Sequence, residues 1–247
     1  MELIIGIDDT DNIESRGTGQ LAAILAGEVQ DRGLGKCAPV TRHQMLVHPD
    51  IPYTSHNSAM CFPVTVRPGA YGDVIELAQS FLRRESAEGS DPGLCIIDMA
   101  RQGDHSPLVE FGLRAKREVL QKQEAYALAD RLGIHLSEHG GTGLGVIGAL
   151  AGCGLRLTGN DGRFRGHFQI GPVGETLKVF ELIQRTGVDL VQSLDGEPLA
   201  PEAAVRIGEK VKAVLLGGKA TMLVYNDSGN GAPPCWKTCD KKQLRVY

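Results

Sequence analysis

The stretch Leu3-Ile4-Ile5-Gly6-Ile7-Asp8-Asp9-Thr10-Asp11 places three carboxylates directly after an apolar run. Residues 2–7 predict a buried strand, so the acidic residues begin where that strand enters a loop. A helix is expected from about Gln20 to Arg32, because apolar residues recur there at helical spacing and Gly33 follows. A strand, an acidic loop and a helix in this order predict an α/β layer at the start of the chain.

The acidic loop carries a chemical prediction. Asp8, Asp9 and Asp11 would repel one another in a dry site unless a cation lay among them, and hard divalent ions such as Mg²⁺ take oxygen ligands. The following turn, Ser15-Arg16-Gly17-Thr18-Gly19, leads into a helix N-terminus, which suits a metal-bound phosphate group. Thr10 and Gly17 would then border the nucleotide. The alternative is a solvated turn whose acids serve as capping residues.

Length and composition limit the class of protein. The chain has 247 residues, 42% hydrophobic and 23% charged, as expected of one or two globular domains. No apolar run is long enough to span a bilayer and no signal pattern begins the chain, so a cytoplasmic protein that does not enter a membrane is expected. Its six cysteines are scattered, several inside apolar runs, which favours reduced thiols. The oligomeric state stays open, with a homo-oligomer among the options.

Charge is a weak argument for nucleic-acid binding by the whole chain, because the net charge is -4. Residues 206–247, however, hold eight Lys or Arg and three Asp or Glu. This basic segment could meet an anionic partner, or it could be an ordinary solvated face.

The pattern of elements predicts an α+β fold with mixed α/β layers. A larger α/β domain is expected over residues 1–172, and a small, mainly β domain over residues 173–247. Pro63 suggests an edge or a bulge in its strand. The expected elements include strands at 37–47, 59–66, 94–98, 134–136 and 165–170, helices at 70–84 and 108–132 (the latter one helix or two broken near Gly112), and a hairpin at Gly217-Gly218.

A second motif is the glycine-rich run from Gly140 to Ala151. It contains Gly143-x-Gly145-x-x-Gly148, a formal dinucleotide fingerprint that is weak by itself. Backbone N–H groups of such a loop, from Gly141 to Gly148, can also cradle phosphates without a nicotinamide. The alternative is close helix packing through small residues.

Other polar residues are candidates for supporting roles. Arg16 could neutralise charge in a transition state, and Thr18 could be a nucleophile, a phosphate donor group or the N-cap of the first helix. His56 and Asn57 lie in a polar loop, where they could orient a substrate or satisfy the loop itself. Asp98 ends a buried strand and could join the site from a neighbouring strand.

Three segments in order resemble a known family. Ile5 to Asp11 with Arg16-Gly17-Thr18 resembles the N-terminus of the archaeal agmatidine synthetases for isoleucine tRNA (TiaS). The segments Ile51–Ala59 and Gly143–Gly154 resemble two further segments of that family. The family's full enzymes continue into an OB-fold domain and a zinc ribbon, whereas here Cys235 and Cys239 have no matching pair.

The resemblance implies ATP and Mg²⁺ as cofactors and a kinase-like domain. It implies metal coordination by Asp8, Asp9 and Asp11, a phosphate-accepting hydroxyl at Thr18, and nucleotide contacts from the glycine loop. We therefore expect an enzyme of ATP-dependent ligase or kinase-like transferase type, related to a tRNA-modifying synthetase, with the substrate undefined. The alternatives are a non-catalytic nucleotide- or RNA-binding protein and, on the Gly143 fingerprint alone, an NAD-dependent oxidoreductase.

Overall fold

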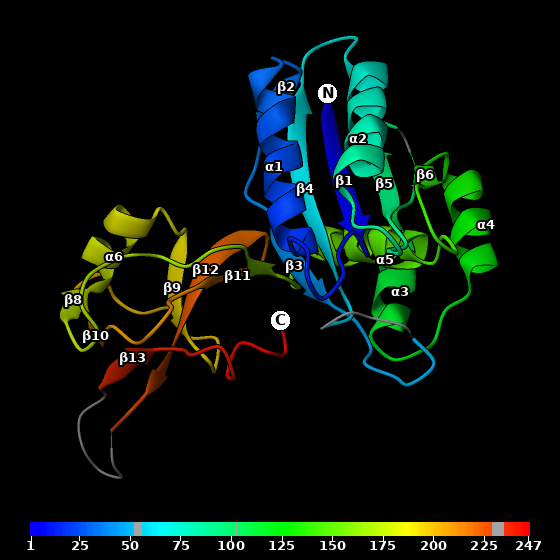
Figure 1. The fold of residues 1–247 in the computed structure, drawn as a ribbon. Coiled ribbons are helices and arrows are strands. Elements are labelled where there is room, and N and C mark those ends of the chain that lie inside the picture. Colours follow the sequence, from blue (N-terminus) through cyan, green and yellow to red (C-terminus); the bar gives the residue numbers. More distant parts are fainter. Residues whose placement is uncertain (52–55, 102, 229–234) are drawn as a thin grey trace. The chain divides into compact units, whose positions relative to one another are not determined.

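The computed structural model describes residues 1–51, 56–101, 103–228 and 235–247, and the chain divides into two compact units (Figure 1). Unit 1 comprises Met1–Thr158 and unit 2 comprises Gly159–Tyr247. The sequence placed this division near residue 172 instead. Phe164, Phe168 and Ile170 account for the difference, because they pack into the core of unit 2.

The sheet of unit 1 has β1 at its centre, antiparallel to a neighbour on each side. All pairs among its described strands are antiparallel. The parallel βαβ crossover that a dinucleotide fingerprint requires is therefore not seen in the described part of this unit. In spatial order the strands are β6 (His135–Glu138), β5 (Gly93–Asp98), β1 (Glu2–Asp8) and β4 (Ser58–Val66), with β3 (Thr41–Gln44) and β2 (Gly35–Cys37) both on the far edge of β4.

Alternation along β1 explains why helices cover both faces of this sheet. Leu3, Ile5 and Ile7 point into one core cluster with α1 and α2, whereas Ile4 points into a second cluster with the remaining helices. Figure 1 shows α1 and α2 on one side and α3 and α5 on the other. The helices are α1 (Thr18–Asp31), α2 (Tyr71–Glu85), α3 (Ser106–Ala115), α4 (Lys122–Leu132) and α5 (Gly145–Leu157).

Helix α5 lies unusually close to its neighbours. A Cβ at Gly6 would come within 2.7 Å of the carbonyl oxygen of Ala149 in α5. A Cβ at Gly112 in α3 would come within 2.8 Å of both the Ala151 oxygen and the Leu155 nitrogen. Gly112 therefore permits helix packing and does not break its helix, and the break falls instead between Ala115 and Lys122.

Pro63 lies inside the sheet, so the expectation of an edge strand is wrong. The alternative of a bulge agrees with the register, because residues 38–40 face only residues 62 and 63 of β4. Strand β4 pairs with β1 on one side and with β2 and β3 on the other. The carbonyl of Pro63 accepts from Ala38, which lies in the gap between β2 and β3. The missing N–H of the proline faces the same gap, where no ladder hydrogen bond is needed.

Unit 2 is small and mainly β, as expected. Its core includes Leu177, Leu182, Val191 and Met222. Gly217 and Gly218, with φ of +56° and +73°, form the expected hairpin turn between β11 and β12. The expected strand at 165–170 is absent. The strand found in its place is the two-residue β7, in which Arg163 pairs with Val214 of β11. The elements are β7 (Arg163–Phe164), β8 (Thr176–Lys178), α6 (Val179–Thr186), β9 (Leu190–Ser193), β10 (Ala204–Arg206), β11 (Ala213–Leu216), β12 (Lys219–Asn226) and β13 (Trp236–Thr238).

Among the described residues, no helix combines the length and the apolar character needed to cross a membrane.

Candidate functional site

The antiparallel register gathers three segments at one end of the unit 1 sheet. Asp8 at the end of β1 pairs with Gly93 at the start of β5, and Gly93 pairs with Glu138 at the end of β6. The same register places Asp98 beside Leu3, at the opposite end. Asp98 therefore does not join the acidic residues, and its side chain accepts a hydrogen bond from Ala100 instead.

A pocket opens at this end of the sheet and encloses about 590 Å³, including its open mouth. The expected residues Asp8, Asp9, Asn57, Gly145 and Gly148 line it together. Four of the described lining residues are acidic and none is Lys or Arg, while the remaining wall is largely apolar. The other lining residues are Met45, Asp50, Ile51, Ala115, Glu118, Val119, Leu120, Leu144 and Ile147.

Burial and crowding raise the pKa of two of the four acids in the pocket lining, Asp8 and Asp9. Burial raises the pKa of Asp8 to about 8, and the neighbouring charges of Asp9 and Asp11 add to the effect. Burial, followed by the charges of Asp91 and Asp11, raises the pKa of Asp9 to about 6. Asp9 also has a positive φ of 50°, an uncommon conformation for a residue with a side chain. Ionising both acids therefore carries an energetic cost, which a bound cation would relieve.

Helix α5 forms one wall of the pocket with its first turns. A Cβ at Gly148 would collide with the Asp8 carboxylate, so this carboxylate lies directly against the helix backbone. A Cβ at Gly145 would collide with the backbone of Asp91. Both glycines are needed for close packing, which is the alternative that the sequence left open, and both also border the pocket.

Thr18 lies beside the pocket and not on its lining. It is 6% exposed and is the first residue of α1, while Gly17 is the N-cap. Its hydroxyl donates to Asp11 Oδ1 at 2.7 Å and accepts from Thr10 Oγ1 at 3.1 Å. The N-cap role considered for Thr18 is therefore wrong. The hydroxyl instead links Thr10 and Asp11 to the start of the helix.

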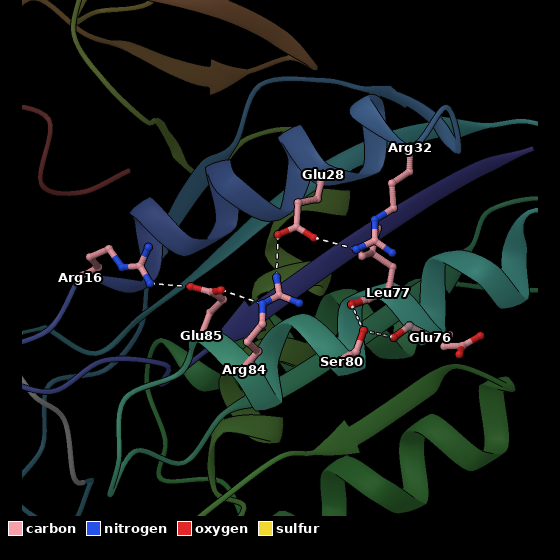
Figure 2. Close-up of polar contacts among 8 residues, drawn as sticks. All are labelled: Arg16, Glu28, Arg32, Glu76, Leu77, Ser80, Arg84 and Glu85. Atoms are coloured by element: carbon pink, nitrogen blue, oxygen red, sulfur yellow. Dashed lines mark hydrogen bonds and ion pairs between the residues drawn. The ribbon is translucent and has the colours of Figure 1, made fainter.

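Arg16 forms an ion pair with the last residue of α2. Its Nη2 donates to Glu85 Oε2 at 2.6 Å, and Glu85 also accepts from Arg84 (Figure 2). Arg84 in turn pairs with Glu28 of α1 at 2.7 Å. This exposed network connects the acidic loop and α1 to the end of α2.

The first part of the glycine loop is occupied by the chain itself. Asp91 Oδ1 accepts from the backbone N–H groups of Thr142 and Gly143, and Asp91 Oδ2 accepts from Thr142 Oγ1 at 2.7 Å. A Cβ at Gly141 would collide with the same carboxylate. Gly141 and Gly143 therefore surround Asp91 and do not line the pocket.

The polar loop is described only in part, because residues 52–55 lie outside the described residues. Asn57 donates from Nδ2 to the Leu46 carbonyl at 2.7 Å, so it satisfies the local backbone as well as lining the pocket. His56 is exposed and is not among the described lining residues.

Sequence reasoning missed four residues of this region. Asp50 and Glu118 add negative charge to the pocket, Asp91 holds the glycine loop, and Lys122 donates to Glu138 and to the Thr142 carbonyl. No local sequence signal marks Asp91, because its place beside the glycine loop depends on the antiparallel pairing of β1 and β5.

The residues fit a nucleotide only together with a cation. A triphosphate alone would meet the acids of the pocket, whereas a divalent ion would neutralise them. Among the described residues, no three His, Cys, Asp or Glu side chains are arranged to hold a metal ion. Mg²⁺ in nucleotide sites commonly takes only one or two carboxylates and completes its shell with phosphates and water. Asp8 and Asp9 meet that smaller requirement.

Part of the chain is homologous to synthetases that act on tRNA. The tRNA 2-agmatinylcytidine synthetase TiaS of Methanosarcina acetivorans, named for an isoleucine tRNA, is 33% identical over 159 residues, or 63% of this chain and 36% of that enzyme. TiaS of Methanosarcina mazei is 35% identical over 163 residues, with the same shares. An uncharacterized protein of Methanocaldococcus jannaschii is 29% identical over 157 residues, or 62% of this chain and 50% of that protein. The chain thus spans about a third of the TiaS enzymes that it matches.

Solved structures agree with this relationship. The TiaS complex with its isoleucine tRNA and ATP aligns with a TM-score of 0.54 and 31% identity, over 62% of this chain and 36% of that chain. A tRNA fluorescent labeling enzyme aligns with a TM-score of 0.54 and 32% identity over the same shares. No family model matches the chain.

Proposed function

We propose that unit 1 binds ATP with Mg²⁺ and catalyses phosphoryl or nucleotidyl transfer, as a ligase or kinase-type transferase. The observation that carries this proposal is the shared pocket, in which Asp8 and Asp9 face the first turns of α5 at Gly145 and Gly148. Such a transfer needs carboxylates that hold a cation and, next to them, a helix N-terminus that binds phosphates. The solved TiaS complexes with ATP and with AMPCPP and agmatine support the nucleotide.

In this proposal each residue has a definite task. Asp8 and Asp9 hold the metal, with Asp11 close by, and the metal when bound neutralises phosphate charge. Asp11 Oδ1 receives the hydroxyl proton of Thr18 if that hydroxyl accepts a phosphoryl group, because the two atoms already share a 2.7 Å hydrogen bond. Arg16 is proposed to neutralise charge after leaving Glu85, and Asn57 and His56 to orient a substrate.

The acceptor class that the relatives support is RNA, because both TiaS enzymes are named for a tRNA. The basic segment 206–247 is compatible with an RNA partner. A filter-binding titration against tRNA at several salt concentrations tests this partner, and binding that is absent or independent of salt would rule it out.

The central experiment compares Asp8→Ala with Asp98→Ala. Both remove an aspartate at the end of a central strand, but only Asp8 lies in the pocket. We expect Asp8→Ala to abolish calorimetric binding of MgATP and nucleotide hydrolysis, and Asp98→Ala to retain both. Retained binding in Asp8→Ala would contradict the proposal. Binding without any turnover in the wild-type chain would favour the non-catalytic alternative. The oxidoreductase alternative is not carried forward, since its parallel βαβ unit is not seen among the described strands of unit 1.

A further inference from the structure

The glycine loop has the shape of an anion-binding nest. Gly141 and Gly143 have positive φ of +55° and +75°, and the amide groups of Thr142 and Gly143 point to one side. Concave arrangements of successive backbone N–H groups of this kind bind phosphates and carboxylates. In this chain the anion inside the nest is the Asp91 carboxylate, which receives those two N–H groups and the Thr142 hydroxyl.

Asp91 is held in the nest from several directions. Side chains at Gly141 or Gly145 would collide with its carboxylate or its backbone. On the outer side of the loop, Lys122 Nζ donates to the Thr142 carbonyl at 2.7 Å and to Glu138 at 2.9 Å. The loop, the start of β5 and the start of α4 are therefore tied into one arrangement.

A filled nest changes what the neighbouring pocket can bind. The nest donors of Thr142 and Gly143 are already used, and Asp91 adds its negative charge to the field around Asp9. The described pocket lining itself contains four acidic residues and no Lys or Arg. A phosphate group that arrives without a cation thus meets repulsion and finds the Thr142 and Gly143 donors already engaged.

We propose that Asp91 is a specificity-determining residue, which fills the anion nest of the glycine loop and so makes phosphate binding in this site depend on a divalent cation. This inference rests on the proposed function for its nucleotide, but the state of the nest can be tested without one. The same inference places the phosphates at the first turns of α5, beside Asp8 and Asp9, and not at the N–H groups of Thr142 and Gly143.

The experiment uses the full chain and the variants Asp91→Ala, Asp91→Asn and Asp98→Asn. Asp98→Asn is the matched control. Asp98, the last residue of β5, also accepts a hydrogen bond from a backbone N–H, but it lies at the opposite end of the sheet. Calorimetry measures binding of inorganic phosphate in EDTA, of metal-free ATP in EDTA, and of MgATP. Circular dichroism and melting temperature check that each variant folds.

We expect Asp91→Ala to bind phosphate and metal-free ATP at least about tenfold more tightly than the wild type. The variant lacks a nearby negative charge, and the Thr142 and Gly143 groups that donate to Asp91 become available to the phosphate. Asp91→Asn should show a smaller gain in the same direction, and it carries the test if Asp91→Ala does not fold. Asp98→Asn should match the wild type. A purely structural role for Asp91 would give weaker binding or none, never a gain.

The outcomes separate the two proposals. If no Asp91 variant gains affinity for inorganic phosphate, the filled nest is overturned even when the wild type binds MgATP. If the variants gain affinity for phosphate while the wild type does not bind MgATP, the inference about the filled nest is supported and the proposed function fails. Phosphate oxygens found on the Thr142 and Gly143 N–H groups in a wild-type nucleotide complex would also overturn the inference.

Discussion

The Asp8 carboxylate occupies the space that a side chain at Gly148 would need. Strand β1 and helix α5 are thereby matched at one point, where the last residue of the strand lies against the backbone of the helix. This contact brings the acidic loop and the first turns of α5 into a single pocket. A change of one methyl group at position 148 should therefore affect the site directly.

Gly148→Ala should weaken MgATP binding at least about tenfold and lower stability by about 1–3 kcal/mol, the range for overpacking a filled contact. Gly72→Ala in α2 is the matched control, since a Cβ there meets nothing within 4 Å. It should leave binding unchanged and raise stability by about 0.5–1 kcal/mol, the usual gain from alanine in a helix. Urea unfolding and calorimetry measure both effects, and equal behaviour of the two variants would refute the contact.

Asp8→Asn should stabilise the metal-free protein while abolishing MgATP binding. The folded-state pKa of Asp8, about 8, lies above its ordinary value of 3.8, so the folded chain holds a proton that the unfolded chain releases between these pH values. Stability should fall as pH rises from about 4 to about 8, by at most about 1.4 kcal/mol per pH unit from this group. The asparagine removes that fall.

Thermal unfolding in EDTA at several pH values checks this sign. The advantage of Asp8→Asn over the wild type should be near zero at pH 4 and grow toward pH 8, and Mg²⁺ should reduce it. If the stability of the two proteins depended on pH in the same way, ionisation of Asp8 would not destabilise the folded state, and this prediction would be wrong.

Thr18→Val should destabilise unit 1 by about 1–3 kcal/mol, because it removes the hydroxyl that joins Thr10 to Asp11 in a buried position. Thr18→Ser keeps the hydroxyl and should stay close to the wild type. Urea unfolding measures stability, and labelling with γ-phosphate-labelled ATP measures phosphoryl transfer to the chain. Labelling that persists in Thr18→Val would exclude Thr18 as the acceptor.

Arg16→Ala and Glu85→Ala separate a structural ion pair from a catalytic arginine. The pair is partly exposed, so either variant should change stability by no more than about 1 kcal/mol. If Arg16 leaves Glu85 to neutralise phosphate charge, only Arg16→Ala should slow nucleotide turnover, whereas Glu85→Ala should retain it. Equal turnover in both variants would restrict Arg16 to the surface network of Figure 2.

Local sequence patterns predicted most of the elements for a simple physical reason. The apolar run before Asp8, the helical spacing after Gly69 and the Gly217-Gly218 turn each depend on interactions within a few residues. Errors arose where a neighbour in space decided the outcome. Pro63 is tolerated inside the sheet because of a gap between two other strands, and Gly112 stays helical because α5 lies against it.

The sequence by itself determined the α+β class, the mainly β character of unit 2 and the presence of an acidic loop after the first strand, because burial periodicity and turn chemistry are written in neighbouring residues. Only the tertiary structure decided which acids meet. Antiparallel pairing brought Asp91 beside the glycine loop and sent Asp98 to the other end of the sheet. Strand direction is a property of the assembled sheet, since the same alternating pattern fits either direction.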